Sequence, residues 1–519
     1  MSIGEGRAAV RADPRAAGRR SPIGRSPRAP VRPEVSTRAL LFGVVVVTLL
    51  AQLAVLALQS RHQWQHFNLS WDFAFFHQAW HEIGSGRLNP RITLVGYSFW
   101  QSHLELIAWP LALLGRLHRD DGLSMLYLQD VALVATEAVV VAWVWCATRE
   151  RRAGWPAAFT VPVALGLLVA NPWIYKIANE DFHYEPLGVF FLALGAFELW
   201  RGRRRGWVFL VLALMCGDVV GTYAIGLGLS FLVARRTRRR GLYLLAAGIG
   251  FFLLVGVLGA NRGSGIVKYG YLASSGKAAE GIGGLLSVLA GMVHHPSRPI
   301  HAIGGKLGRV FDHLSPTGLL GVVAPWSFGV LVVVLLENTL NGDSGFVNAG
   351  FQNAPVYFFG VLGSVLLLQH LSRRRDGFRV VAVIALAAVV INAAVYDARH
   401  LRRLDMYHVS GTAAAELAAV RRKIPDNAEV VSTFGVIGRF AGRRSVYTQL
   451  ADNTRVPVEA ETVVFVFAPT AGNQPRPATA VEKTRLFVRD QLRARPILEG
   501  AEVSAYEWHR TGARSVTLP

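Results

Sequence analysis

The sequence predicts an α-helical polytopic membrane protein that carries a small soluble α/β domain at its C-terminal end. Hydrophobic residues make up 52% of the 519 residues, and the mean hydropathy is +0.33. Charged residues reach only 17%, against about a quarter in ordinary soluble domains. Apolar runs of roughly 20 residues, long enough to cross a bilayer, recur over residues 39–396.

The net charge of +21 is concentrated in short basic clusters that separate apolar runs. These clusters are RERR at 149–152, RGRRR at 201–205, RRTRRR at 235–240 and SRRR at 372–375. Positive loops of this kind stay in the cytoplasm, so the charge indicates membrane topology and not nucleic-acid binding. The only two cysteines, Cys146 and Cys216, both lie in apolar runs, which argues against a disulfide framework.

The N-terminal region combines a polar arm with a first membrane anchor. Residues 1–38 are rich in Arg, Pro, Gly and Ser, which is typical of a disordered arm, here basic and cytoplasmic. The run 39–58 can cross the bilayer, which places residues 59–103 outside. This external loop is rich in tryptophan, a residue that prefers membrane interfaces, so we expect short surface helices there. Segment 105–117 is too short to cross, whereas 123–145 can return the chain.

The central region contains a hydrophobic segment with basic clusters at both ends, so the positive-inside rule places both of its ends in the cytoplasm. Run 156–174 goes out and run 186–200 comes back, whereas run 207–234 lies between two basic clusters and must begin and end in the cytoplasm. Such a segment is short for two full crossings. We therefore expect a broken helix or a tight hairpin near Asp218, where a polar cavity satisfies the freed backbone groups.

The remaining hydrophobic runs complete a transmembrane domain over residues 39–396. Run 242–258 crosses outward and is followed by an external stretch, 259–314, with an amphipathic surface helix. Of runs 318–336 and 356–371, one is expected to be re-entrant, and 380–395 is the last span. The prediction is a bundle of about 9–12 hydrophobic helices, counting re-entrant ones.

Residues 397–519 differ in character from the region before them. Segments 429–434, 445–450, 462–467 and 502–508 are β-branched or aromatic, as in strands, and 484–495 has a helical pattern. We expect a small soluble domain outside the cytoplasm, because long domains translocate regardless of charge. A cytoplasmic tail is the alternative.

Three carboxylates next to long apolar runs are the main candidates for function. They are Asp72 in NLSWDFAFFHQAW, Asp181 in NEDFHYEPLG and Asp218 in CGDVVGTYAIG. A charge near the bilayer costs at least a few kcal/mol, so acids retained there usually line a cavity where substrate, ion or proton passes. The simpler interpretation is that these acids cap helices, pair with arginine or face water, and Asn68 and Ser70 are suitable for a helix cap near Asp72.

The order of these motifs resembles a family of bacterial predicted membrane proteins known as domain of unknown function 2079, which is similar in turn to GT-C class membrane glycosyltransferases. The resemblance covers most of residues 39–510. It is carried by WDFAFFHQAWHEIGSGR, SHLELIAWPLALL, LQD at 128–130, NEDFHYEPLG, the GDVVG block and IPDNAEVVSTFGVIGRFAGRRSVY. The family usually has Lys-Glu-Asp at the GDVVG block, and here only Asp218 of that triplet is retained.

The resemblance implies a GT-C-like helix bundle, a sugar donor linked to polyprenyl phosphate, and an acid in the first external loop, the position that Asp72 matches. Asp72 would then be the general base, and Asp181 and Asp218 would adjust its charge or position the sugar. Alternatively, these three carboxylates would hold a divalent cation. His103, His183 and Glu185 are candidates for substrate binding, and Lys176, Lys306 and Arg309 for the donor phosphate.

Two other function classes stay open. A transporter or flippase of a lipid-linked or polar substrate would use the acids as proton or ion relays, although the hydrophobic segments show no evident internal repeat. A noncatalytic envelope protein would bind a partner through its tail. No Rossmann glycine pattern and no Walker loop occurs in the sequence, which favours a lipid-linked donor over a nucleotide. The sugar, the acceptor and the oligomeric state do not follow from the residues.

Overall fold

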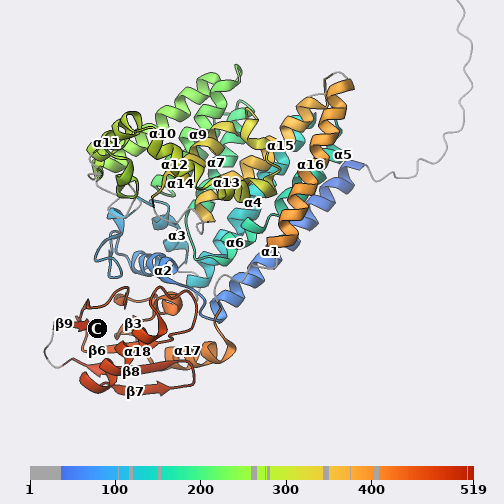
Figure 1. Cartoon of the computed structure of the whole chain (residues 1–519). Helices are drawn as coiled ribbons and strands as arrows, with labels where there is room; N and C mark the ends of the chain where they lie inside the picture. The colour runs from blue at the N-terminus through green and yellow to red at the C-terminus, as the bar shows by residue number, and fades with distance from the viewer. Residues whose placement is uncertain are drawn as a thin grey trace, which may run out of the picture.

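The computed structural model confirms a mainly helical membrane protein with a C-terminal α/β domain (Figure 1). It describes residues 37–102, 104–115, 121–149, 154–258, 266–274, 276, 281–342, 350–374, 376–400, 408–510, 512 and 514–519. The predicted arm 1–38 therefore lies almost wholly outside the described residues.

Five helices within the described residues are long and apolar enough to cross a membrane. They correspond to α1 (Thr37–Gln65), α4 (Asp121–Arg149), α10 (Arg238–Leu258), α15 (Ala354–Leu371) and α16 (Asp376–His400). A bent pair, α5 (Ala157–Val169) and α6 (Pro172–Asn179), forms a sixth span if the two helices are counted together, with an angle of 41° between them. The bend occurs at Asn171, whose side chain accepts a hydrogen bond from the N–H of Trp173 and so starts α6 as a new helix.

Helices too short to span alone surround these segments. They are α3 (Ala108–Gly115), α7 (Glu185–Trp200), α8 (Gly206–Leu214), α9 (Asp218–Val233), α11 (Gly281–His294), α12 (Ser297–Gly304), α13 (Leu307–Leu314) and α14 (Phe328–Leu340). The break between α8 and α9 falls at Gly217, which has a φ of 127°. The predicted interruption next to Asp218 is thus present in the structure.

The C-terminal domain is an α/β unit with a five-stranded mixed sheet. Its strand order is β4-β3-β6-β8-β7, with β3 parallel to both β4 and β6 and β8 antiparallel to β6 and β7. The strands are β3 (Glu429–Ser432), β4 (Val446–Thr448), β6 (Thr462–Phe467), β7 (Arg495–Glu499) and β8 (Ser504–His509). Helices α17 (Gly411–Lys423) and α18 (Ala478–Leu486) flank the sheet, and β5 (Thr454–Pro457) pairs with β9 (Ser515–Leu518).

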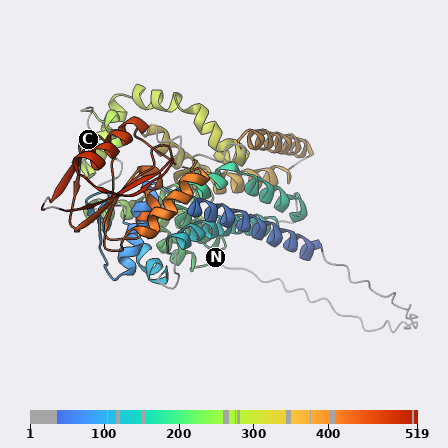
Figure 2. The same ribbon diagram turned by 90° about the horizontal axis from the view of Figure 1, so that it is seen from below.

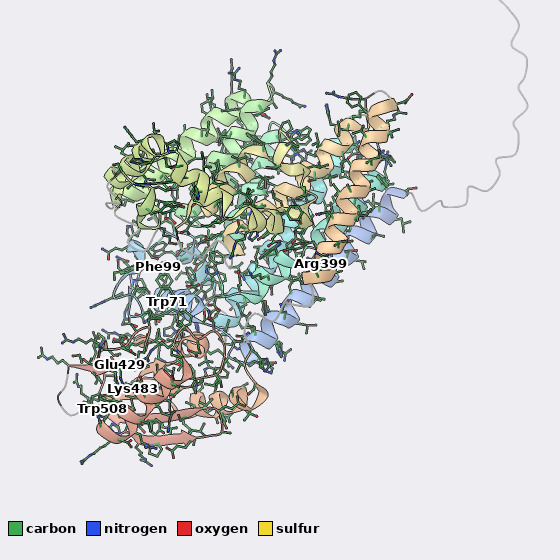
Figure 3. The ribbon with its side chains drawn as sticks, viewed as in Figure 1. Trp71, Phe99, Arg399, Glu429, Lys483 and Trp508 are labelled. Atoms are coloured by element: carbon green, nitrogen blue, oxygen red, sulfur yellow. The ribbon has the colours of Figure 1, made fainter. Side chains whose placement is uncertain are left out.

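A layer between the helix bundle and this domain is built from residues 66–102. It contains α2 (Trp71–Gly84) and a small hairpin of β1 (Arg91–Ile92) and β2 (Tyr97–Ser98). Figure 3 shows Trp71 and Phe99 in this layer, with Glu429, Lys483 and Trp508 in the domain beyond it.

The C-terminal domain is anchored to this layer by specific contacts. The N–H of Gly438 donates to the carbonyl of Leu69 at 2.9 Å, and the carbonyl of Gly438 lies 3.0 Å from Nδ1 of His77. Thr93 exchanges two hydrogen bonds with the backbone of Val446. These contacts place α2 directly against the domain.

The direction of α1 relates the N-terminal side of the bundle to the C-terminal domain. Helix α1 begins at the end of the bundle far from the C-terminal domain and ends beside that domain (Figure 1). In Figure 2, where the molecule is turned to be seen from below, the domain lies over one side of the bundle. The start of α1 and the C-terminal domain therefore lie at opposite ends of the bundle.

Candidate functional site

Asp72 lies in the first turn of α2, where a negative charge is favoured by the helix dipole. Its side chain is 48% exposed, and its Oδ2 atom lies 3.7 Å from Nε2 of His183. The cap position belongs to Ser70, not to Asp72, and the Ser70 side chain makes no capping bond to its own helix. Asp72 is thus not the N-cap of this helix, and its carboxylate is accessible and next to a histidine.

Asp181 accepts two hydrogen bonds from Ser70, the N-cap residue of α2. Its Oδ1 accepts from the Ser70 N–H at 2.8 Å, and its Oδ2 accepts from the Ser70 hydroxyl. Burial raises the pKa of Asp181 to about 6, the charge of Asp72 adds to that rise, and the Ser70 bonds oppose it. Asp181 therefore joins the α6–α7 connection to the start of α2, with both carboxylate oxygens engaged.

His183 is buried, and its ring contacts both Phe351 and the backbone of Asp181. Its ring stacks on Phe351 with 3.5 Å between ring centroids, and its Nδ1 lies 2.9 Å from the carbonyl of Asp181. Burial lowers the pKa of His183, but the interactions with the carboxylates of Asp72 and Glu185 outweigh burial and raise the pKa to about 9. At neutral pH the ring is therefore an imidazolium beside two aspartates.

Two glutamines from spanning helices fix the connection that carries Asp181 and His183. Gln63 of α1 donates to the carbonyls of Asn179 and Glu180 at 3.1 and 3.2 Å. Gln129 of α4 donates to the carbonyl of Ile177 and accepts from the N–H of His183 at 2.9 Å. The polar connection is thereby held rigidly on the bundle.

Asp218 joins the region through intermediate residues. It is the first residue of α9 and is 6% exposed. Electrostatic interactions link Asp218 to Tyr223, Tyr223 to Glu185, and Glu185 to His183. The structure therefore brings Asp72 and Asp181 into contact with His183, and Glu185 interacts with His183 electrostatically.

Glu337 of α14 also belongs to this region, although the sequence motifs do not single it out. It interacts electrostatically with Asp218 and Lys268, and it forms a side-chain hydrogen bond with Thr222. A glutamate inside the apolar stretch VLVVVLLENTL was the available signal, because an ionisable residue in such a run is a candidate for function by default.

The remaining predicted residues have separate surroundings. Lys176 lies over the ring of Trp173, and its Nζ is 3.8 Å from Oε1 of the buried Glu180. Lys306 precedes α13 and donates to the carbonyl of Asn341, whereas Arg309 is exposed on α13. His103 lies outside the described residues.

Acidic side chains can also bind metal ions, which raises the question of a metal site among the described residues. In the part of the chain that the structure describes, no group of three or more His, Cys, Asp and Glu is placed to hold a metal ion. The contacts of Asp72 and Asp181 instead go to His183 and Ser70. The arrangement is suited to proton transfer and charge stabilisation by side chains.

Comparisons with known proteins place the chain in a family. No curated protein matches the chain. Among solved structures, it is similar to the crystal structure of ArnT from Cupriavidus metallidurans in the apo state, with 13% identity and a TM-score of 0.43 over 90% of this chain and 98% of that chain. The family model described as "Predicted membrane protein (DUF2079)" matches residues 64–484. The chain belongs to this family of membrane proteins.

Proposed function

We propose that the protein is an integral-membrane glycosyltransferase that moves a sugar from a polyprenyl-phosphate-linked donor to an envelope acceptor at the outer face of the membrane. The observation that carries the proposal is the accessible carboxylate of Asp72 beside the imidazolium of His183. Asp72 lies in the layer between the helix bundle and the soluble domain, and His183 lies in the α6–α7 connection of the bundle next to it. A lipid-linked donor would approach from the bundle side, and a polar acceptor from the side of the domain.

In the proposed reaction, a hydroxyl oxygen of the acceptor attacks the anomeric carbon of the donor sugar. A carbon–oxygen bond forms, and the bond between that carbon and the phosphate oxygen breaks with its electron pair leaving on the polyprenyl phosphate. Asp72 takes the proton of the attacking hydroxyl as general base. Its 48% exposure leaves room for the hydroxyl.

The surrounding residues have supporting roles in this proposal. His183 holds the carboxylate of Asp72 in place and contributes a positive charge near the departing phosphate, which favours the transition state. Asp181 fixes the start of α2 through Ser70. Arg309, Lys306 and Lys176 supply cationic groups to the donor phosphate as it approaches along the membrane surface.

The direction of α1 supports the proposed placement at the outer face. The basic arm before α1 is expected in the cytoplasm, and the C-terminal domain lies at the other end of that helix (Figure 1). The candidate site and the C-terminal domain would then both be extracytoplasmic. An impermeant thiol reagent tests this placement on an otherwise cysteine-free protein with one cysteine introduced at Asp452, an exposed position of the domain.

The test of the function is a lipid analysis of cells that lack the protein. We expect a polyprenyl-phosphate-linked sugar to accumulate in the deletion strain, and the wild-type chain to remove it. The Asp376→Asn variant serves as control, because Asp376 is 96% exposed and lies at the start of α16. An unchanged pool of lipid-linked sugars would contradict the proposal. A pool of normal size retained on the cytoplasmic face would instead indicate the flippase.

A further inference from the structure

Two carboxyl groups lie fully buried inside the spanning helix α4. Asp130 and Glu137 are both 0% exposed. They are seven residues apart, which is about two helical turns, so they lie on the same face of the helix. Neither takes part in the site described above, and the reaction proposed for that site uses neither of them.

Helix α1 meets this face with polar side chains in matching positions. Gln52 donates from Nε2 to Oε1 of Glu137 at 2.8 Å, and Ser60 interacts with the carboxyl group of Asp130. Gln52 and Ser60 are eight residues apart on α1, so the two polar pairs follow the antiparallel packing of the helices. Gln52 and Ser60 are themselves buried, at 3% and 0% exposure.

These two acids have no cationic partner among the residues that the structure describes. No lysine, arginine or histidine there forms an ion pair with Asp130 or Glu137. The neighbouring titratable group is the phenol of Tyr175, which interacts with Glu137. Burying an ionised carboxylate without a partner is strongly unfavourable, whereas a neutral carboxylic acid avoids that desolvation penalty.

Buried polar atoms without a hydrogen-bond partner indicate which carboxyl oxygen is protonated. Oε1 of Gln52 and Oε2 of Glu137 are both buried acceptors without a hydrogen-bond partner. A proton on Oε2 of Glu137 turns that atom into a donor and lets the acid and the amide form two parallel hydrogen bonds. The hydroxyl of Ser60 and both oxygens of Asp130 also lack a hydrogen bond of ordinary geometry, and a proton on Asp130 adds a second donor to this pair.

We propose that the contact between α1 and α4 is an intramembrane proton-binding site, in which Glu137 carries a proton and pairs with Gln52 through two hydrogen bonds. Asp130 beside Ser60 is a second protonated acid, two helical turns nearer the candidate site. The site binds α1 to α4 at membrane depth. It thereby positions Gln63 and Gln129, the two side chains that hold the Asp181–His183 connection.

Infrared spectroscopy of the purified full-length protein tests the protonation directly. We expect the C=O stretch of a protonated carboxylic acid at neutral pH, with a shift in heavy water. Glu137→Gln should remove one component of this band and Asp130→Asn another, while Asp376→Asn leaves the band unchanged. If the wild-type spectrum contains no carboxylic acid component that Glu137→Gln removes, the proposal is wrong.

A variant series tests the pairing independently of the spectrum. The amide introduced by Glu137→Gln can form the same two bonds with Gln52, so this variant should keep the thermal midpoint of the wild type, whereas Glu137→Leu and Gln52→Leu should lower it. The double variant Gln52→Glu with Glu137→Gln exchanges the two partners and should keep the wild-type midpoint even if a leucine variant fails to fold. A loss of stability in both the amide variant and the exchanged pair would overturn the proposal.

Discussion

Asp72 and Asp181 have different surroundings, and this difference is the basis for the roles that we propose for them. Asp181 is engaged by the N–H and the hydroxyl of Ser70, whereas Asp72 is 48% exposed and lies 3.7 Å from His183. A general base must reach the proton that it abstracts. In the proposed reaction, Asp72 meets this condition and Asp181 acts as a positioning residue.

Replacing Asp181 with asparagine should therefore affect the protein mainly through its structure. The amide oxygen can still accept from the Ser70 N–H and the amide nitrogen can donate to the Ser70 hydroxyl, but both hydrogen bonds lose their charge assistance, at a cost of about 1 kcal/mol. We expect a lower thermal midpoint in detergent together with a partial loss of turnover. Asp181→Asn with a wild-type midpoint and no turnover at all would instead make Asp181 a catalytic residue.

The raised pKa of His183 predicts a pH-dependent contribution to stability. The folded protein holds the imidazolium up to a pKa of about 9, above the ordinary value of 6.5. The ring thus favours the folded state fully below pH 6.5, and this contribution is lost as the pH rises through about 9. Thermal midpoints of the wild type and His183→Gln should differ most near pH 6 and converge toward about pH 10. A difference that does not change with pH would contradict the charged state of His183.

At the scale of elements, the break between α8 and α9 places Asp218 at a helix start. The positive φ of Gly217 allows the chain to turn there. Basic clusters on both sides of 207–234 were sufficient to predict the interruption, because they constrain where the segment begins and ends.

A side chain at Gly217 should strain this turn. The Gly217→Ala variant is expected to lose about 1–3 kcal/mol of stability, since alanine strongly disfavours the glycine conformation. Gly250→Ala is the matched control, because Gly250 lies within α10 and an added Cβ atom would meet nothing within 4 Å. Thermal midpoints measured in the same detergent compare the two, and equal midpoints would mean that the turn adapts.

At the scale of the whole molecule, the main feature is the docking of the C-terminal domain against α2. A Cβ atom at Gly438 would lie 2.5 Å from Cβ of Leu69 and 2.9 Å from its carbonyl oxygen. Gly438→Ala should therefore displace the domain from α2, speed proteolytic release of the domain and reduce turnover. Gly411→Ala is the control, because an added Cβ there meets nothing within 4 Å. Unchanged proteolysis of Gly438→Ala would show that the docking tolerates the methyl group.

The sequence predicts the parts of this molecule that rest on local pattern. Apolar length identifies α1, α4, α10 and α16, and a β-branched and aromatic run identifies β6 over the residues it occupies. The helix predicted over 484–495 lies instead at Ala478–Leu486, followed by a π-helix over Phe487–Gln491, and the prediction does not include β7, whose first residue falls at the end of the helical pattern.

Contacts that join distant segments could not be predicted in this way. The bond between Gly438 and Leu69 joins segments far apart in the chain and leaves no local signature. Asp72, Asp181 and His183 were named as candidates, but the role of Ser70 depends on a fold-dependent hydrogen bond. Asp130 falls within the LQD motif but is not among the predicted site residues, and no motif marks Glu137 or Glu337, although ionisable residues in apolar runs are candidates for function.

Asp72 is the proposed general base of the sugar transfer, so the decisive experiment is to measure the turnover of the Asp72→Asn variant. The substitution removes the charge with little change in volume. With the lipid-linked sugar identified from the deletion strain as donor, the account predicts a rate lower by about 100-fold to 10,000-fold, with normal membrane insertion and with Asp376→Asn at the wild-type rate. A wild-type rate for Asp72→Asn would contradict the account.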